Sequence, residues 1–297
     1  MRSPHRLHDR ASFFKYMPAS TAKLVLANTS LRWSSHVLFN DPFDVPRELS
    51  FGITPKEIAE AVIRRFASLI EQPPQDTSVL RPDLAMVIDA VKGGIPPEVR
   101  EEVLAAINEP HDTQQLAAAM EGLRTLWRSW IPDFRILCLT ESATHAAMWL
   151  HYADGYKGAV LEFNCDDEAD SAWLQAEPVT YPAHKPEIFE ADGWANLMMM
   201  PLYQATKTIL HVSTFTKAPD WSYEKEWRVT SSKRRGDSGF FTDYQFHTKE
   251  LATVYLGPLM PADDKEALIA LTRKYPQARV FEVAIGMSRE FLLNRVG

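Results

Sequence analysis

The sequence predicts an α+β fold in which a mixed, mainly antiparallel sheet is interrupted after two strands by a helical insertion. Three observations lead to this prediction. Two strand patterns flank a helical one near the N-terminus, the chain from Thr54 to about Pro132 is almost purely helical in pattern, and strand patterns return after Pro132. A doubly wound parallel sheet would need strands and helices in regular alternation, which is absent.

The N-terminal part predicts a strand, a helix and a second strand. The segment SFFKYM (12–17) predicts a strand, and the apolar positions of 19–30 predict a helix. LRWSSH (31–36) reads as the second strand, followed by the turn-forming NDP at 40–42.

The helical part begins at 54–72, where Thr54 and Glu57 form the pattern of a capping box. Further helices are predicted over 82–92, 96–108 and 112–130. The chain accordingly divides into an N-terminal part of the α+β domain at 1–53, a helical insertion or cap at 54–132 and the remainder of the α+β domain at 133–297.

The C-terminal part is rich in Val, Leu, Phe and Tyr in short runs that predict strands. These runs are 135–141, 158–164, 177–181, 226–231, 253–257 and 278–284. Helices are predicted between them at 187–209 and 261–275.

Composition limits the classes of function. The formal net charge of −7 provides no global attraction to nucleic acid or to an anionic membrane, and no apolar run approaches the length of a membrane span. Two cysteines are too few for a disulfide framework, and the polar N-terminus lacks the apolar region of a signal peptide, so we expect a cytoplasmic protein. The chain contains no GxGxxG, P-loop, GxSxG, HExxH or CxxC pattern, and no metal site is expected.

Three separated segments combine Trp or Tyr with clustered polar residues: 13–17 with 32–44, then 138–158, then 221–229. Aromatic surfaces beside polar groups suit a cleft that holds a flat, polar, nucleotide-like small molecule. The sequence therefore predicts a composite site built from all three.

The first segment offers Lys15, Tyr16, Arg32, Trp33 and Ser34. Because strands joined through a single helix can lie side by side, we expect Tyr16 and Ser34 on one wall, where Lys15 or Arg32 would neutralise a phosphate. The alternative is that the two aromatic rings pack in the core and the cations are solvated.

Asn40 and Asp41 follow in a run dense in turn formers. A structural turn is the favoured role, because Asp41 precedes a proline and Asn40 can cap local backbone groups. The alternative is that one of these side chains faces the cleft.

The second segment places Met148, His151 and Tyr152 at helical spacing, with Trp149 and Lys157 nearby. A single histidine is more often structural than functional, but its polar and aromatic neighbours make His151 a candidate. Tyr152 and Trp149 are candidates to stack on a ligand.

The third segment alternates Glu224, Glu226 and Arg228 at the head of a predicted strand, which would place all three on one face. Buried charges need partners, so one interpretation is an internal salt bridge between Arg228 and a neighbouring carboxylate. In the other, one glutamate stabilises a developing cation while Arg228 orients it.

These residues also carry a family resemblance. The order FFKY, LRWSS, FNDPFD, CLTES, MWLHYADGYKG and K-x3-W-x-YEKEWR resembles the bacterial family filed as domain of unknown function 2971, over about 11–45 and 135–285. That family has no settled activity, so the resemblance identifies relatives without supplying a function.

The chain also resembles, more loosely, the ADP-ribosyltransferase fold. That fold has a first strand with His or Arg, a later strand with Ser or Tyr, and a catalytic Glu on a late strand. The corresponding positions here are, in order, Lys15-Tyr16, Trp33-Ser34 and Glu226. Lys15 departs from the usual residue. The resemblance implies NAD as substrate of an ADP-ribosyltransferase or NAD glycohydrolase, with a protein or nucleic-acid acceptor and a role in phage defence or as a toxin.

In that reading Glu226, assisted by Glu224 and His151, is catalytic. Tyr16, Trp33, Trp149 or Tyr152 would stack on a ring of the ligand, and Lys15, Arg32 or Arg228 would hold its pyrophosphate. Two alternatives stay open: a non-catalytic module that senses a nucleotide or a phage component, and a nuclease. The oligomeric state is open as well.

Overall fold

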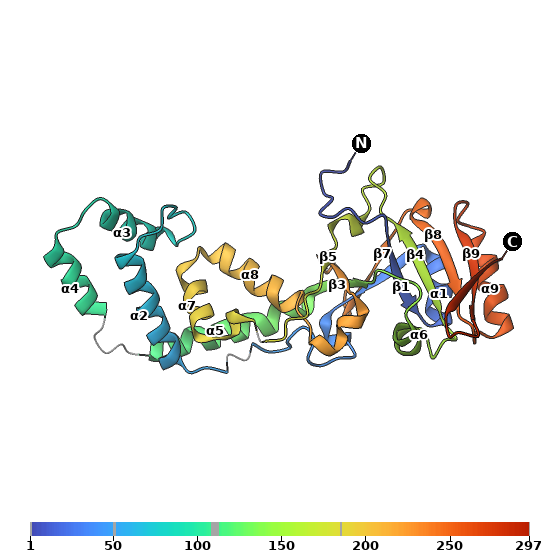
Figure 1. The fold of residues 1–297 in the computed structure, drawn as a ribbon, viewed down its shortest axis with the longest axis horizontal. Coiled ribbons are helices and arrows are strands. Elements are labelled where there is room, and N and C mark those ends of the chain that lie inside the picture. The colour runs from blue at the N-terminus through green and yellow to red at the C-terminus, as the bar shows by residue number, and fades with distance from the viewer. Residues whose placement is uncertain (1, 50–51, 108–112, 185, 297) are drawn as a thin grey trace. The chain divides into compact units, whose positions relative to one another are not determined.

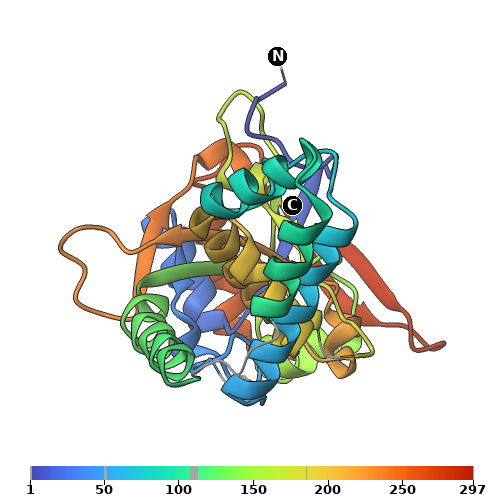
Figure 2. The same ribbon diagram turned by 90° about the vertical axis from the view of Figure 1, so that its left-hand side faces the viewer.

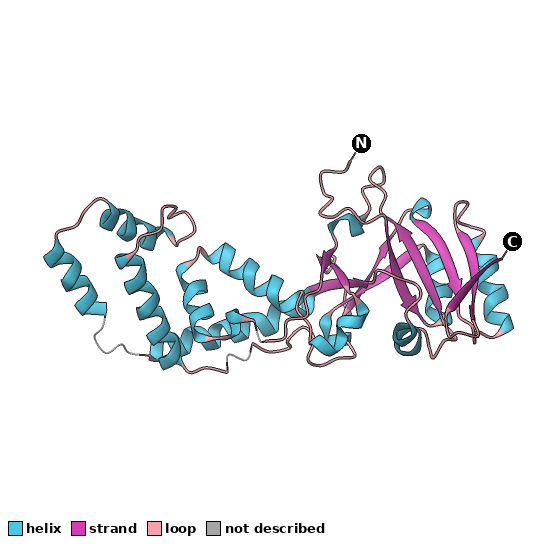
Figure 3. Cartoon of the chain, in the orientation of Figure 1, coloured by secondary structure: helices cyan, strands magenta, loops and turns pink. Residues whose placement is uncertain are grey.

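The computed structural model describes residues 2–49, 52–107, 113–184 and 186–296. They form two compact units, one of residues 1–40, 132–181 and 219–297 and the other of 41–131 and 182–218. The strands of the described residues all belong to the first unit, and the second is helical (Figures 1 and 3). The α+β class with mainly antiparallel pairing is thereby confirmed.

The first unit contains two five-stranded sheets rather than the single sheet that the sequence predicts. The first has the strand order β1 (Ser12–Met17), β4 (Ala159–Asn164), β8 (Leu251–Leu256), β9 (Arg279–Ile285) and β10 (Phe291–Val296). Its neighbours are antiparallel except β8 and β9. Parallel neighbours need a crossover connection, which helix α9 (Ala262–Thr272) supplies here.

The second sheet has the order β5 (Glu177–Pro178), β6 (Trp227–Ser232), β3 (Phe134–Leu139), β2 (Ser30–Ser34) and β7 (Phe241–Gln245), with every pair antiparallel. Consequently β1 and β2 lie in different sheets, and the expectation that Tyr16 and Ser34 share one wall as strand neighbours is wrong. The reason is that each strand finds a more distant partner: β1 pairs with β4, and β2 with β3 and β7.

The two sheets meet at one backbone pair. The N–H of Phe14 donates to the carbonyl of Thr140 over 2.9 Å, and the N–H of Thr140 donates back to Phe14 over 2.9 Å. Beyond this pair β1 continues along β4, whereas β3 continues between β6 and β2. The sheets therefore diverge from this point.

The largest apolar core unites both sheets with helices α1 (Ala19–Asn28) and α9. Phe13, Leu137 and Leu161 contribute to it and are fully or almost fully buried. A smaller core on the other side of β1 contains Tyr16 of β1 and Trp149 of helix α6 (Ala146–Tyr152). Figure 1 shows α6 beside β1 and α9 beside β9.

The second unit is built from helices α2 (Pro55–Glu71), α3 (Pro82–Lys92), α4 (Pro97–Ile107), α5 (Gln114–Trp130), α7 (Ala191–Met199) and α8 (Leu202–Thr214). Its core includes Leu69, Ile70 and Ile88 and takes in Met199 of α7. The predicted capping box is present: Thr54 Oγ1 accepts from Glu57 N, and Glu57 Oε2 accepts from Thr54 N. This unit thus includes 182–218, which the sequence did not group with the helices of 54–132.

Short 3-10 helices complete the chain at His36–Leu38, Ile131–Asp133, Ala172–Gln175, Glu187–Phe189, Pro219–Glu224 and Thr248–Glu250. Most of the helical span predicted over 187–209 is helical, but it is divided into α7 and α8, because Met200 is extended at φ −84 and ψ 157 and Pro201 is the N-cap of α8. Strands β7 and β10 were not predicted. Residues 108 and 112, the predicted ends of two helices, lie outside the described residues.

Two glycines seat the segment after α6 against the first sheet. A Cβ atom on Gly158 would lie 2.3 Å from the carbonyl oxygen of Met17, and one on Gly257 would lie 2.2 Å from that of Tyr156. The N–H of Gly257 donates to the carbonyl of Gly158 over 3.0 Å. Only glycine permits this close approach of three backbones.

We therefore expect Gly158→Ala to lower the free energy of unfolding by about 1–3 kcal/mol, because the methyl group forces the backbones apart. Gly122→Ala is the matched control, since a Cβ there meets nothing within 4 Å and alanine favours the helix by about 0.5–1 kcal/mol. Urea unfolding measures both. Equal effects of the two changes would contradict this account.

Candidate functional site

The candidate site lies where the sheets diverge. Strand β3 pairs with β2 at Ile136 and meets β1 at Thr140, and between these two residues the structure gives it no ladder pairing to either strand. The side chain of Lys15 bridges this gap: its Nζ donates to the carbonyl of Cys138 over 2.6 Å. The half-buried ammonium group of Lys15 therefore lies beside the stretch of β3 that has no partner strand on this side in the described part of the chain.

A buried ion pair adjoins the same stretch of β3. Cys138 lies directly opposite Arg228 of β6, so their side chains share one face of the sheet. The Glu226 carboxylate accepts twice from Arg228, at 2.8 Å from Nε and 3.0 Å from Nη2, and the two side chains are only 6% and 0% exposed. The ring of Phe39 lies 5.5 Å from the guanidinium carbon. The salt-bridge interpretation of Arg228 thus describes an observed contact.

A second buried carboxylate belongs to Glu224. Its Oε1 accepts from the hydroxyl of Tyr152 over 2.5 Å, and its backbone carbonyl accepts from Thr140 Oγ1 over 2.5 Å. The expectation that Glu224 lies on a strand face with Glu226 is wrong: it ends a 3-10 helix, and Lys225 follows with a φ of 43. That left-handed residue turns the chain between the two glutamates.

Burial determines the protonation state of two groups here. Desolvation raises the pKa of the Cys138 thiol, and the negative charge of Glu226 raises it further. Desolvation also raises the pKa of Tyr152, with the hydrogen bond to Glu224 acting in the same direction. At neutral pH both groups are protonated, so the site offers neither a thiolate nor a phenolate nucleophile.

Tyr16 and Trp149 build the wall behind these groups. The Tyr16 hydroxyl donates to the carbonyl of Ser142 over 2.9 Å and accepts from the N–H of His145 over 3.2 Å. Trp149 is fully buried, and its ring meets that of Tyr16 edge-on at 5.5 Å. Both rings are core residues that hold α6 in place, which leaves the half-buried Tyr152 beside the carboxylates.

His145 is a residue that sequence reasoning missed. It is the N-cap of α6, and its ring stacks on Tyr223 with centroids 5.4 Å apart. Its Nδ1 is buried, and no hydrogen bond to it is found among the described residues. The position immediately before a short helix in a polar-aromatic segment was the available signal.

Of the other predicted residues, Trp33 and Arg32 lie apart from this cluster, and Ser34 lies at its edge. Trp33 is buried in the larger core. Arg32 is exposed, pairs with Asp243 and stacks on Phe241 at 3.6 Å. Ser34 pairs with Ile136 at the edge of the gap.

The turn residues and the end of α6 face outward. Asn40 is exposed, and Asp41 accepts from the N–H of Phe43 in the predicted structural turn. His151 and Lys157 are exposed, whereas Tyr152 next to His151 is half-buried. At the end of α6, Tyr152 is therefore turned toward the protein and the neighbouring His151 toward solvent.

Two absences hold for the described part of the chain. No three His, Cys, Asp or Glu side chains are arranged there to hold a metal ion. Likewise, no helix there combines the length and the apolar character of a membrane span.

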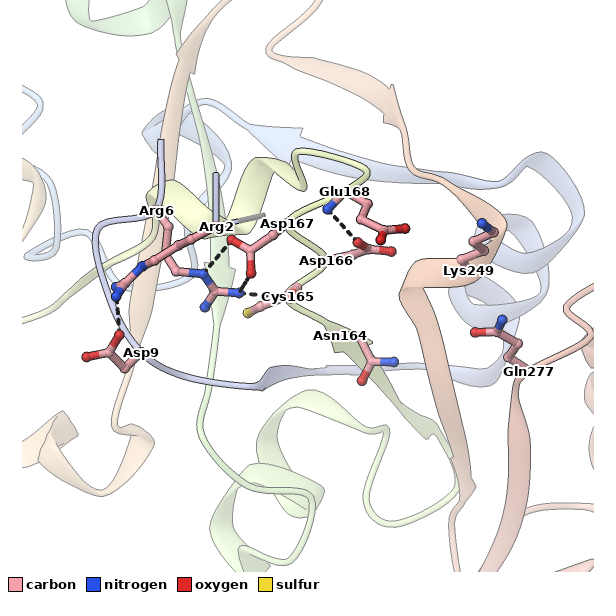
Figure 4. Close-up of a pocket in the computed structure, with 10 residues that line it drawn as sticks. All are labelled: Arg2, Arg6, Asp9, Asn164, Cys165, Asp166, Asp167, Glu168, Lys249 and Gln277. Carbon is pink, nitrogen blue, oxygen red and sulfur yellow. Dashed lines mark hydrogen bonds and ion pairs between the residues drawn. The ribbon is translucent and has the colours of Figure 1, made fainter. Parts of the chain in front are cut away.

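A separate polar pocket of about 700 Å³ lies beside the N-terminal segment (Figure 4). Arg6 crosses it and pairs with both oxygens of Asp167, at 2.8 and 2.9 Å, while Arg2 pairs with Asp9. Asp167 also accepts from the N–H of Ser3 over 2.9 Å. These charges fasten the N-terminal segment to the loop after β4, so we assign the pocket a structural role.

Comparison with known proteins bears on the family. Residues 148–229 match the family described as "Protein of unknown function (DUF2971)", which confirms the predicted resemblance over that segment. The matched segment includes α6 from Met148 onward, Glu224, Glu226 and Arg228. No curated protein matches the chain, and no solved structure does.

The buried ion pair yields a stability prediction. Arg228→Met should lower the free energy of unfolding by about 3–5 kcal/mol, because it leaves the Glu226 carboxylate buried without its guanidinium. Arg32→Ala removes a pair of the same type that is about half exposed and should cost less than about 1 kcal/mol. Chemical denaturation compares the two, and similar losses would contradict the assigned burial.

The Arg6 contact yields a pH prediction. It lowers the pKa of Asp167 to about 2, below the usual value of about 3.9. A depressed carboxyl pKa stabilises the folded state above the unfolded pKa, so this contribution is complete above about pH 4 and is lost as the pH falls toward 2. The Ser3 amide resonance should therefore titrate near pH 2, and nearer 4 in Arg6→Gln. A wild-type midpoint near 4 would refute the pairing.

Proposed function

We propose that the protein is an enzyme that breaks the N-glycosidic bond of NAD, as an ADP-ribosyltransferase or an NAD glycohydrolase. The single observation that carries this proposal is the pair of buried glutamates, Glu224 and Glu226, at the divergence of the two sheets. Burying a carboxylate costs several kcal/mol unless it is paired. Two buried carboxylates close together are therefore more typical of a functional site than of a core.

The chemistry matches a carboxylate that is held charged. Cleavage of the bond between the nicotinamide nitrogen and the ribose carbon leaves positive charge on the ribose, and the nicotinamide departs with the bonding electrons. A fixed negative charge in a water-poor site stabilises that developing cation. Arg228 fixes the orientation of the Glu226 carboxylate through the bidentate contact.

The surrounding groups support a nucleotide-like substrate. Lys15 is half-buried at the gap and can bind a pyrophosphate, giving up its contact with the Cys138 carbonyl. The rings of Tyr152 and of the His145–Tyr223 stack offer aromatic surface beside the carboxylates. The acceptor is water for a glycohydrolase, or a group on a protein or nucleic acid for a transferase.

Glu226→Gln tests catalysis directly. The substitution keeps the volume and removes the charge, so nicotinamide release from NAD should fall about a hundredfold or more while NAD affinity barely changes. Thermal melting run beside the assay separates catalysis from folding. Loss of stability without a selective loss of turnover would make Glu226 a structural residue.

The matched control is Glu162→Gln, which alters a half-buried glutamate of β4 that accepts from Ser12 and Tyr255. It should leave the release of nicotinamide within about threefold, because removing a group that takes no part in charge stabilisation leaves the barrier unchanged. Binding of NAD without turnover in the wild type would instead favour a nucleotide-sensing module.

A toxin or phage-defence role follows from the proposal, because consumption of NAD would lower the NAD concentration of the host cell. Induced expression should then arrest bacterial growth, and Glu226→Gln should relieve the arrest. Arrest that persists in this variant would separate toxicity from NAD chemistry.

A further inference from the structure

Strand β10 ends the first sheet and leaves one side of its backbone open. The described residues pair it with β9 alone. The N–H of Gly286 donates to the carbonyl of Glu290 over 2.9 Å, which makes these two a hydrogen-bonded pair. Because such pairs alternate along an antiparallel ladder, the N–H and C=O groups of Phe291, Leu293 and Arg295 point away from β9.

Apart from the charge of Arg295, the described residues of this edge lack the usual protection against pairing. Natural edge strands are kept apart by Lys, Pro, bulges or very short length. Strand β10 reads FLLNRV over six residues, and its register with β9 runs without a shift. Leu292 and Leu293 are 44% and 42% exposed. In contrast, β5 at the edge of the other sheet has only two residues. Figure 2 shows the red β9–β10 hairpin at the margin of its sheet.

The edge is complementary to itself. Phe291, Leu293 and Arg295 lie on one face of the strand, two residues apart. If a second β10 runs antiparallel with Leu293 opposite Leu293, then Phe291 faces Arg295 of the other copy, twice by symmetry. This register uses all the outward groups in about six hydrogen bonds and forms two cation–π pairs.

We propose that the protein forms a two-fold dimer in which the β10 strands of two copies pair antiparallel about Leu293 and join their first sheets. A two-fold interface requires a patch that complements itself, and this register provides it. The proposal is independent of the NAD chemistry. The partner is a second copy of the chain, and a strand from another protein is an outcome that the test distinguishes.

The test is sedimentation equilibrium of the full chain from about 1 to about 500 µM, a range that spans interfaces of this limited size. We expect a concentration-dependent dimer. Leu293→Pro removes an outward N–H and leaves the inward bonds to β9, so it should abolish the dimer while the melting temperature of dilute protein stays unchanged. Leu202→Ser alters an equally apolar but unrelated residue, 83% exposed, and should leave the dimer intact.

A compensating pair tests the register even if Leu293→Pro impairs folding. Phe291→Arg sets two arginines opposite each other and should weaken dimerisation at least about tenfold. Adding Arg295→Phe restores the aromatic–cation pair and should bring the affinity back to within about threefold. A wild type that is monomeric throughout, dimers that persist in Leu293→Pro, or no rescue by the double variant would overturn the proposal.

Discussion

The buried pair of Glu226 and Arg228 is the interaction on which the candidate site depends. A buried ion pair contributes little net stability compared with apolar side chains of similar volume, yet losing one partner is costly. Its bidentate geometry fixes the Glu226 carboxylate relative to β3, next to the Cys138 thiol and the gap bridged by Lys15. Burial, and after it the charge of Glu226, raises the pKa of that thiol, which restricts the chemistry available there.

The divergence of the two sheets provides the space around that pair. Strand β1 and the end of β3 share one backbone pair at Phe14 and Thr140 and then separate. Among the described residues, a stretch of β3 is therefore without a partner strand on that side, and a side chain binds its backbone instead. Helix α6 supplies Tyr152 to this region and is held through Trp149, Tyr16 and the close approach at Gly158. Packing in the smaller core and hydrogen bonding to Glu224 therefore act on the same helix.

Local sequence signals predicted the elements that local chemistry determines. The capping box of Thr54 and Glu57 and the strand predicted over 12–17 correspond to α2 and β1. The division into two sheets was not predictable, because it depends on pairing between residues far apart in the chain. The strand face predicted for Glu224 is wrong because Lys225 has a positive φ, which a sequence without glycine at that position does not indicate. The polar-aromatic segments identified the residues that gather at the gap but not which rings would be buried.

If the proposed function is right, Glu226 faces a bound nucleotide beside the unpaired stretch of β3. A crystal structure of the Glu226→Gln variant soaked with NAD tests this most directly, because the variant should retain the substrate uncleaved. We expect the ribose of the nicotinamide half within hydrogen-bond distance of residue 226, at about 2.6–3.2 Å, and the pyrophosphate beside Lys15. NAD bound elsewhere on the protein, or a gap that excludes it at saturating concentration, would contradict it.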